Sequence, residues 1–416
     1  MPNTFNYEKM FSTNSQDTPI RVVQHARYDF AVAYPAPETL PLDGLAEALR
    51  VAIDTKGDEM ARNMAYYPHA RGLPELRELV VEKLWHDRGF KVTPDEIVIT
   101  SGSSEANALL IQAITNPGDV VLAEEYVYTG TLAQLRKFGA TVVGTPLDDQ
   151  GIIPEALEAL VKKLAREGRK PKYLYTIPEH QNPTGATIPE ARRKQILDIA
   201  HRHNMPILED DCYVDLRFEG KTQPAFRTLD DSGIVLHVAS FSKIIAPGLR
   251  LGYFTAPEAV TRRAIGFRAG GGPSQFTSYA VEGFLRAHMD DHKNSFRPML
   301  KAKRDAMVAS LAEHFGGTGA KWSRPQGGCY VWLTMPEGTD LTKVQQACLD
   351  DGVGFIAGAS FAPNNNGDHC ARLCFAFESP EKNREGIALL AKLFQKHGVM
   401  KSNGAASKAR PAAARR

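Results

Sequence analysis

The sequence has few features of a secreted, membrane-spanning or nucleic-acid-binding protein. Its 416 residues include only five cysteines, and their odd number and scattered spacing argue against a disulfide framework or a zinc site. The net charge of +2 argues against the broad basic field of a nucleic-acid-binding protein. No stretch is apolar for long enough to cross a bilayer, and no secretion signal opens the chain. We therefore expect a cytoplasmic protein with free thiols, without a metal site, and without a nucleic-acid or membrane partner.

The order of the predicted strands and helices indicates the fold class. Seven β-rich runs occur at 96–100, 120–123, 141–144, 172–177, 206–209, 234–239 and 251–255, and helical stretches at 104–114, 130–138, 154–166 and 189–204 separate the earlier ones. Such alternation predicts an α/β fold with a mostly parallel seven-stranded sheet and helices on both faces. A long helical region at 274–312 is followed by a mixed pattern of strands and helices, which predicts a smaller α+β domain at the C-terminal end.

The length of the chain favours two domains. We expect an N-terminal arm at 1–41, a large domain at 42–295, a small domain at 296–400 and a tail at 401–416. The arm is polar and then rich in proline, and a first helix is expected near 42–56. The tail has five basic residues, no acidic residue and no apolar periodicity, so we expect it to be disordered.

The most informative motif is a lysine that directly follows an apolar strand, in Ser-Phe-Ser-Lys at 240–243, with Gly-Leu-Arg at 248–250. A lysine that forms a Schiff base needs a lowered pKa, which a partly dry pocket and the nearby Arg250 would give to Lys243. The hydroxyls of Ser240 and Ser242 and the guanidinium of Arg250 can also hold a phosphate. An ordinary surface lysine in a loop is the alternative, and this motif alone leaves the two equally favoured.

Three further motifs also follow predicted strands. Asn182 lies in His-Gln-Asn-Pro-Thr-Gly at 180–185, Asp210 and Tyr213 lie in Asp-Asp-Cys-Tyr at 210–213, and Ser103 and Ser104 open a helix. Taken singly, they are compatible with a turn, an exposed acidic pair and a helix cap. However, the carboxyl ends of parallel strands are where ligands bind in such sheets, and the amides of a helix start suit a phosphate.

In this order, the motifs resemble the class I/II aminotransferases of the fold-type-I pyridoxal-phosphate enzymes, and most of all the branch with 2-aminoadipate and kynurenine aminotransferases. The resemblance covers residues 20–398. It implies that Lys243 carries pyridoxal 5'-phosphate as a Schiff base and moves the proton, and that Asp210 pairs with the pyridine nitrogen. It further implies that Tyr213 and Asn182 bond the ring oxygen and that Tyr128 stacks on the ring. The phosphate would be held by Ser103, Ser104, Ser240, Ser242 and Arg250.

The resemblance also implies where the substrate and a second subunit bind. Arg372 would clamp the substrate carboxylate with help from Asn182, and Ala33 stands where the branch commonly has a glycine, which would narrow the side-chain pocket. Tyr67 would reach the cofactor phosphate of a partner subunit, so a homodimer with shared sites is expected. Cys212 departs from the small residue or proline that is usual at its position.

The expected reaction moves an amino group from an L-amino acid of the 2-aminoadipate, aromatic or branched-chain type to a 2-oxo acid such as 2-oxoglutarate. A lyase, decarboxylase or cyclase of the same fold would use the same lysine and aspartate and remains an alternative. A regulator that uses such a domain as an effector sensor is a remote alternative, because no helix-turn-helix module precedes the motifs in this sequence. A nicotinamide enzyme is disfavoured, because no Gly-x-Gly-x-x-Gly follows a first strand.

Overall fold

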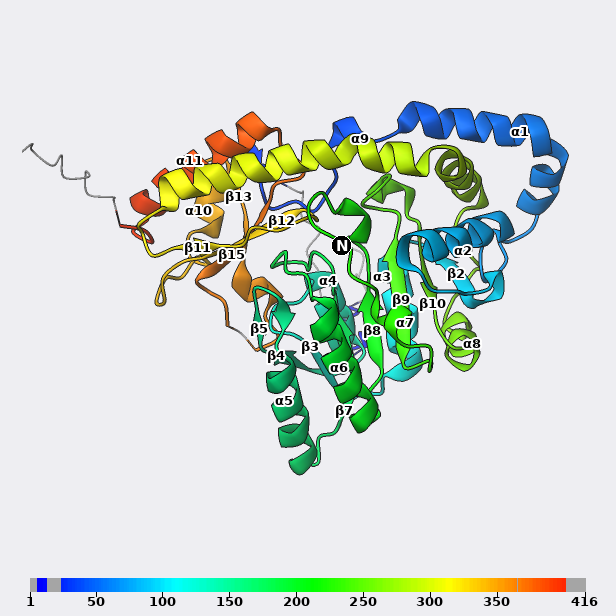
Figure 1. Ribbon diagram of the computed structural model, residues 1–416, viewed down its shortest axis with the longest axis horizontal. Helices are drawn as coiled ribbons and strands as arrows, with labels where there is room; N and C mark the ends of the chain where they lie inside the picture. Colours follow the sequence, from blue (N-terminus) through cyan, green and yellow to red (C-terminus); the bar gives the residue numbers. More distant parts are fainter. Residues whose placement is uncertain (1–5, 13–23, 365, 402–416) are drawn as a thin grey trace, which may run out of the picture.

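A seven-stranded sheet forms the centre of the larger part of the computed structural model, which describes residues 6–12, 24–364 and 366–401 (Figure 1). The order of its strands is β2-β10-β9-β8-β7-β3-β4, and only β10 runs antiparallel to its neighbours. The strands are β2 (Ile97–Thr100), β3 (Val120–Glu124), β4 (Thr141–Thr145), β7 (Pro171–Thr176), β8 (Ile207–Asp210), β9 (Val235–Ser240) and β10 (Gly252–Thr255). The α/β fold with a mostly parallel seven-stranded sheet is confirmed.

Helices cover both faces of this sheet because its strands are apolar on both sides. Along β3, Val121 and Ala123 pack into one core cluster, while Val120 and Leu122 pack into the other. The first cluster receives α2 (Pro74–Arg88), α3 (Ser103–Ile114) and α4 (Thr129–Lys137), and the second receives α5 (Pro154–Arg166), α6 (Glu190–His203) and α7 (Phe226–Leu229). The helix α8 (Glu258–Gly266) lies against α3.

A second sheet, of order β11-β12-β15-β14, belongs to the C-terminal part of the chain. Its strands are β11 (Lys321–Trp322), β12 (Tyr330–Thr334), β14 (Ile356–Ala357) and β15 (Cys370–Cys374), and α10 (Gln345–Asp350) and α11 (Pro380–Lys396) accompany it. The expected arm contributes to this part, because β1 (Tyr28–Asp29) pairs in parallel with β13 (Val353–Gly354). Residues 28 and 29 are therefore packed as a strand of the smaller part.

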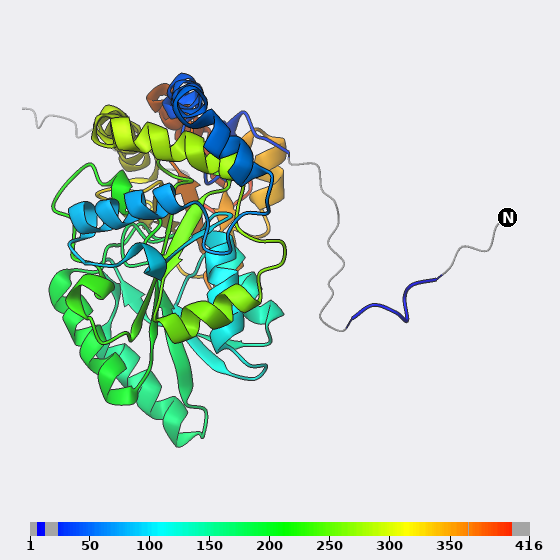
Figure 2. The same cartoon turned by 90° about the vertical axis from the view of Figure 1, so that its right-hand side faces the viewer.

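One helix, α9 (Gln275–Phe315), connects the two parts and runs along one side of the molecule (Figure 1). It packs against α11 at one end and against α1 (Leu42–Met64) at the other, as Figure 2 also shows. The domain boundary that we expect at 295/296 falls inside this helix, next to Pro298. Of the expected basic tail, all but Lys401 lies outside the described residues. Among the residues that are described, no helix has the length and hydropathy needed to span a membrane.

Candidate active site

The predicted site residues meet at the edge of the large sheet where the parallel strands end. Asp210 is the last residue of β8, Lys243 comes three residues after β9, and the Asn182 loop follows β7. The helix α3 begins directly after β2 at the same edge, since β2 runs parallel to β9 across β10. The topology therefore brings four distant motifs of the sequence to one place.

Asp210 is buried, with 3% of its surface exposed, and accepts hydrogen bonds from three side chains. Asn107 Nδ2 and Tyr175 Oη each lie 2.8 Å from its Oδ2, and the Cys212 thiol lies 2.6 Å from its Oδ1. The adjacent Asp211 is also buried, but Arg88 Nε lies 2.8 Å from its Oδ2. Asp211 is thus part of an ion pair, whereas the Asp210 carboxylate is bonded only by neutral donors in the described chain.

Asn182 connects Tyr213 with Arg372. Its Nδ2 donates to Tyr213 Oη at 3.2 Å, and its Oδ1 accepts from Arg372 Nη1 at 3.2 Å. The Tyr213 hydroxyl also lies 3.2 Å from that of Tyr330, and burial raises the pKa of both phenols well above 10. The tyrosines therefore stay protonated at neutral pH and can donate hydrogen bonds to an anionic oxygen.

Arg372 lies on β15 and is 3% exposed. Its guanidinium carbon lies 4.6 Å from the ring centre of Tyr330 and 5.2 Å from that of Phe361. Its Nη2 donates to the carbonyl oxygens of Ala31 and Val32, at 2.6 and 3.2 Å, and its buried Nε has no partner among the described residues. The planar fork is fixed by stacking and keeps donor capacity for a ligand.

Lys243 is half-buried, and its Nζ donates to the carbonyl oxygen of Ala33 at 2.5 Å. The nitrogen also lies 6.0 Å from the centre of the Tyr213 ring. Burial lowers the pKa of Lys243, so a larger fraction of the amine is uncharged at neutral pH than for a solvated lysine. Ala33 thus contacts the Lys243 amine through its backbone carbonyl.

Residues expected around a phosphate lie on two neighbouring loops. Arg250, in the left-handed conformation at φ 52°, donates from Nη2 to the Ser101 carbonyl at 2.8 Å. Gly102 allows this approach, because a Cβ there would lie 2.6 Å from Arg250 Nη2. Ser103 and Ser104 open α3 just beyond, and the backbone N–H of Ser242 donates to Ser240 Oγ at 3.1 Å on the facing loop. Hydroxyls, the start of a helix and a guanidinium therefore lie on these loops, and these are groups that can bind a phosphate.

Tyr128 is partly buried at the start of α4, and burial, together with the charge of Asp210, raises the pKa of its phenol. The ring lies against Gly130, where a Cβ would come within 2.7 Å of it. His180 is fully buried against Gly327, and burial lowers its pKa to about 3, so its imidazole is uncharged at neutral pH. Tyr67 is 89% exposed and therefore takes no part in a site made by one chain.

Asn107, Tyr175 and Tyr330 contact predicted site residues but were not predicted from the sequence. Asn107 lies inside α3 and Tyr175 inside β7, where the local sequence indicates only a helix and a buried strand. A signal was present only for Tyr175, which lies one residue before the end of β7, whereas Asn107 is the fifth residue of α3. Tyr330 opens β12 of the other sheet and comes close only through the tertiary fold.

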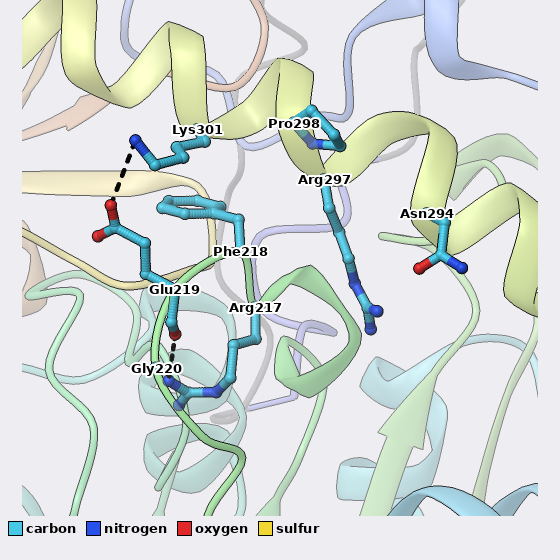
Figure 3. Close-up of a pocket in the computed structure, with 8 residues that line it drawn as sticks. All are labelled: Arg217, Phe218, Glu219, Gly220, Asn294, Arg297, Pro298 and Lys301. Atoms are coloured by element: carbon cyan, nitrogen blue, oxygen red, sulfur yellow. Dashed lines mark hydrogen bonds and ion pairs between the residues drawn. The ribbon is translucent and has the colours of Figure 1, made fainter.

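Two cavities lie outside this set of residues. One, of about 380 Å³, is bounded by residues 217–220 and by α9 around Pro298, and Arg297 points into it (Figure 3). Glu219 accepts from Lys301 at 3.3 Å and, through its carbonyl, from Arg217 at 3.1 Å. The other, of about 750 Å³, lies between the Thr184–Gly185 turn and the strands β11 and β12. Neither is lined by Lys243 or Asp210.

The fold and the arrangement of these side chains define a pyridoxal-phosphate-dependent transferase of fold type I, and comparison with known proteins agrees. The family model described as aminotransferase class I and II matches residues 38–390. Aromatic-amino-acid aminotransferase 1 of Thermococcus litoralis is 32% identical over 402 residues, which cover 93% of this chain and 94% of that protein. The 2-aminoadipate transaminase of Thermus thermophilus is 28% identical over 368 residues, which cover 87% and 89%.

A solved structure gives the same assignment. The α-aminoadipate aminotransferase of Thermus thermophilus, in complex with N-(5'-phosphopyridoxyl)-L-leucine, matches with a TM-score of 0.85 at 27% identity, covering 95% of this chain and 99% of that one. The chain belongs to the class I and II aminotransferase family. It is a pyridoxal-phosphate-dependent enzyme that transfers the amino group of an amino acid to a 2-oxo acid, as the sequence predicts.

Proposed function

We propose that Lys243, Asp210, Asn182 and Arg372 are the central residues of this aminotransferase. The proposal is supported by the contacts that link these residues. Asn182 bonds both Tyr213 and Arg372, and Cys212 bonds Asp210. Lys243 and Arg372 both donate to backbone carbonyls of the arm. Pyridoxal 5'-phosphate, when bound, supplies an aldehyde that condenses with amines and a ring that takes up electrons from the substrate carbon. Lys243 would hold the aldehyde, and Asp210 would face the ring nitrogen with its unneutralised charge.

The other residues bind and orient. Ser103, Ser104, Ser240, Ser242 and Arg250 would hold the phosphate, while Asn182 and Tyr213 would donate to the ring oxygen and Tyr128 would cover the ring. Burial lowers the pKa of Lys243, so part of its amine is uncharged. The uncharged Nζ can take a proton from the substrate α-carbon and then donate that proton again. Arg372 would exchange the carbonyls of Ala31 and Val32 for the substrate carboxylate, which places the substrate between the two domains.

The physiological substrates belong, in our proposal, to the 2-aminoadipate, aromatic or branched-chain amino acids, with 2-oxoglutarate as an acceptor. Support comes from the relatives, which include an aromatic-amino-acid aminotransferase and a 2-aminoadipate transaminase. Tyr330 and Phe361, which stack on Arg372, would provide apolar surface beside the carboxylate. Ala33 would limit the space near Lys243.

We also propose that the enzyme works as a homodimer in the cytoplasm. Exposed aromatic side chains support a dimer, because Tyr66 and Tyr67 are 77% and 89% exposed and Phe267 and Phe276 are 54% and 43% exposed. In such a dimer, Tyr67 would reach the cofactor phosphate of the partner. The five cysteines are all free in the structure, which favours a reducing compartment.

A half-reaction tests transamination against the lyase alternative. The cofactor-loaded enzyme is incubated with an amino acid in the absence of any 2-oxo acid, and the absorbance of the cofactor is followed. We expect one equivalent of 2-oxo acid and conversion of the cofactor to its amine form. Steady release of ammonia and pyruvate would instead identify a lyase. A screen of amino donors with 2-oxoglutarate, read by glutamate formation, then defines the substrate class.

A further inference from the structure

The carboxylate of Asp210 is held by three side-chain donors. Asn107 is 2% exposed and Tyr175 is 0% exposed, and each donates to Oδ2 at 2.8 Å. The Cys212 thiol donates to Oδ1 at 2.6 Å. The three donors come from α3, from β7 and from the turn after β8, so the carboxylate is fixed from three directions.

The surroundings of Tyr175 and Asn107 direct their donor groups to Asp210. Thr131 Oγ1 donates to Tyr175 Oη at 3.1 Å, so the hydroxyl proton of Tyr175 is left to point at Asp210. Asn107 makes its side-chain hydrogen bond to Asp210, while its own Oδ1 is buried and has no partner among the described residues. An unsatisfied buried amide oxygen costs free energy, which an aliphatic residue at this position would avoid.

The third donor is a thiol that stays protonated. Burial, and then the charge of Asp210, raises the pKa of the Cys212 thiol well above 9. The sulfur therefore donates a proton at neutral pH and is a poor nucleophile. The cysteine that departs from the family pattern at position 212 thus supplies a donor to Asp210.

We propose that Asn107, Tyr175 and Cys212 are positioning residues, which orient the Asp210 carboxylate toward the cofactor without neutralising its charge. An arginine or lysine in their place would form an ion pair, as Arg88 does with Asp211. Neutral donors fix the direction of the carboxylate and leave its charge for the ring nitrogen. Because the orientation is fixed before the ligand binds, no reorganisation is needed during the reaction.

The inference rests on the proposed role of Asp210, so its test must separate the two. Tyr175→Phe removes only the hydroxyl that faces Asp210. Its matched control is Tyr173→Phe. Tyr173 lies on the same strand and is also 0% exposed, but its hydroxyl contacts that of Thr115 at 2.9 Å and not Asp210. Asn107→Leu removes the amide at nearly constant volume. Cys212→Ala removes the thiol donor, and Cys212→Ser restores a donor.

Each purified variant is loaded with pyridoxal 5'-phosphate and examined by visible circular dichroism, which reports how rigidly the bound ring is oriented, and by steady-state kinetics. We expect the visible band to weaken and kcat to fall about tenfold in Tyr175→Phe, Asn107→Leu and Cys212→Ala, with KM within about twofold. Tyr173→Phe and Cys212→Ser should resemble the parent enzyme. Thermal unfolding should affect Tyr173→Phe and Tyr175→Phe to similar extents, because each loses one buried hydroxyl.

Asp210→Asn separates a failure of the proposed role of Asp210 from a failure of the positioning inference. If it lowers kcat strongly while the donor variants behave like Tyr173→Phe, then Asp210 has its proposed role and the positioning inference is wrong. If Asp210→Asn itself retains the parental kcat and dichroism, the proposed role of Asp210 is wrong. Equal losses of kcat and of visible dichroism in Tyr173→Phe and Tyr175→Phe would show a structural contribution only and would also overturn the inference.

Discussion

Replacement of Arg372 by lysine separates charge from geometry at the proposed carboxylate clamp. The guanidinium lies 4.6 and 5.2 Å from two aromatic ring centres and reaches Asn182 and the arm through two different nitrogens. A lysine ammonium keeps the charge, but it lacks the planar fork and the face that stacks. The variant therefore removes bidentate recognition while the buried site stays cationic.

The expected loss follows from the contacts. One charge-assisted hydrogen bond to the substrate carboxylate is worth about 1.5–3 kcal/mol, and a desolvated cation–π contact about 0.5–2 kcal/mol. Together they give a loss of about 3 kcal/mol in transition-state stabilisation, which corresponds to a decrease of about 150-fold in kcat/KM. Most of the decrease should appear in KM, with a smaller decrease in kcat from misorientation.

The assay compares an amino acid with the amine that lacks its α-carboxylate, using 2-oxoglutarate as the acceptor. For Arg372→Lys, kcat/KM should fall about 150-fold with the amino acid. With the decarboxylated amine it should change by less than about threefold, because that substrate has no carboxylate to bind. Equal losses for the two substrates would refute the carboxylate role, and so would an unchanged kcat/KM with the amino acid.

Three further predictions concern the cofactor, the dimer and the core. Lys243→Ala should abolish transamination and borohydride trapping of the cofactor, and retention of either would remove Lys243 from its role. Tyr67→Phe should weaken pyridoxal 5'-phosphate binding to the apo-protein about tenfold, whereas Tyr66→Phe next to it should not, and equal affinities would argue against a shared site. Burial raises the pKa of Glu124 from its ordinary 4.5 to about 7. Between these two pH values the folded protein therefore keeps a proton on Glu124 that the unfolded chain has lost. The free energy of unfolding should therefore fall by about 3 kcal/mol as the pH rises from about 4.5 to 7. In Glu124→Gln, urea unfolding across this range should show a weaker dependence on pH. The same dependence in the variant and the parent would contradict the role of Glu124.

The strands and helices of the large sheet could be predicted because each is a local pattern. Runs of β-branched residues end at polar motifs, and the helices between them begin at residues such as Pro154 that favour a first turn. The motif residues could also be placed together, since parallel strands end at one edge. The antiparallel direction of β10 could not be read in this way, because the direction of a strand depends on its connections in space.

The features that could not be predicted depend mainly on contacts between residues far apart in the sequence. Asn107 and Tyr175 look like interior residues of a helix and a strand, and only the packing of α3 against the sheet brings them to Asp210. The arm was expected to lie outside the two domains, yet its residues 28 and 29 pair with β13, more than 300 residues later. The first helix extends beyond the predicted 42–56 to Met64, with a non-helical residue at Lys56.

The long helix α9 has a mechanical consequence for catalysis. At 1.5 Å per residue its 41 residues form a rod of about 60 Å that packs against α1 and α2 as well as α11. Pro298 cannot donate the backbone hydrogen bond of its turn, and open space lies beside it, bordered by Arg297 and Phe218 (Figure 3). Bending is therefore least costly at that turn, where a small change of angle would be amplified into a displacement of the sheet that carries Arg372.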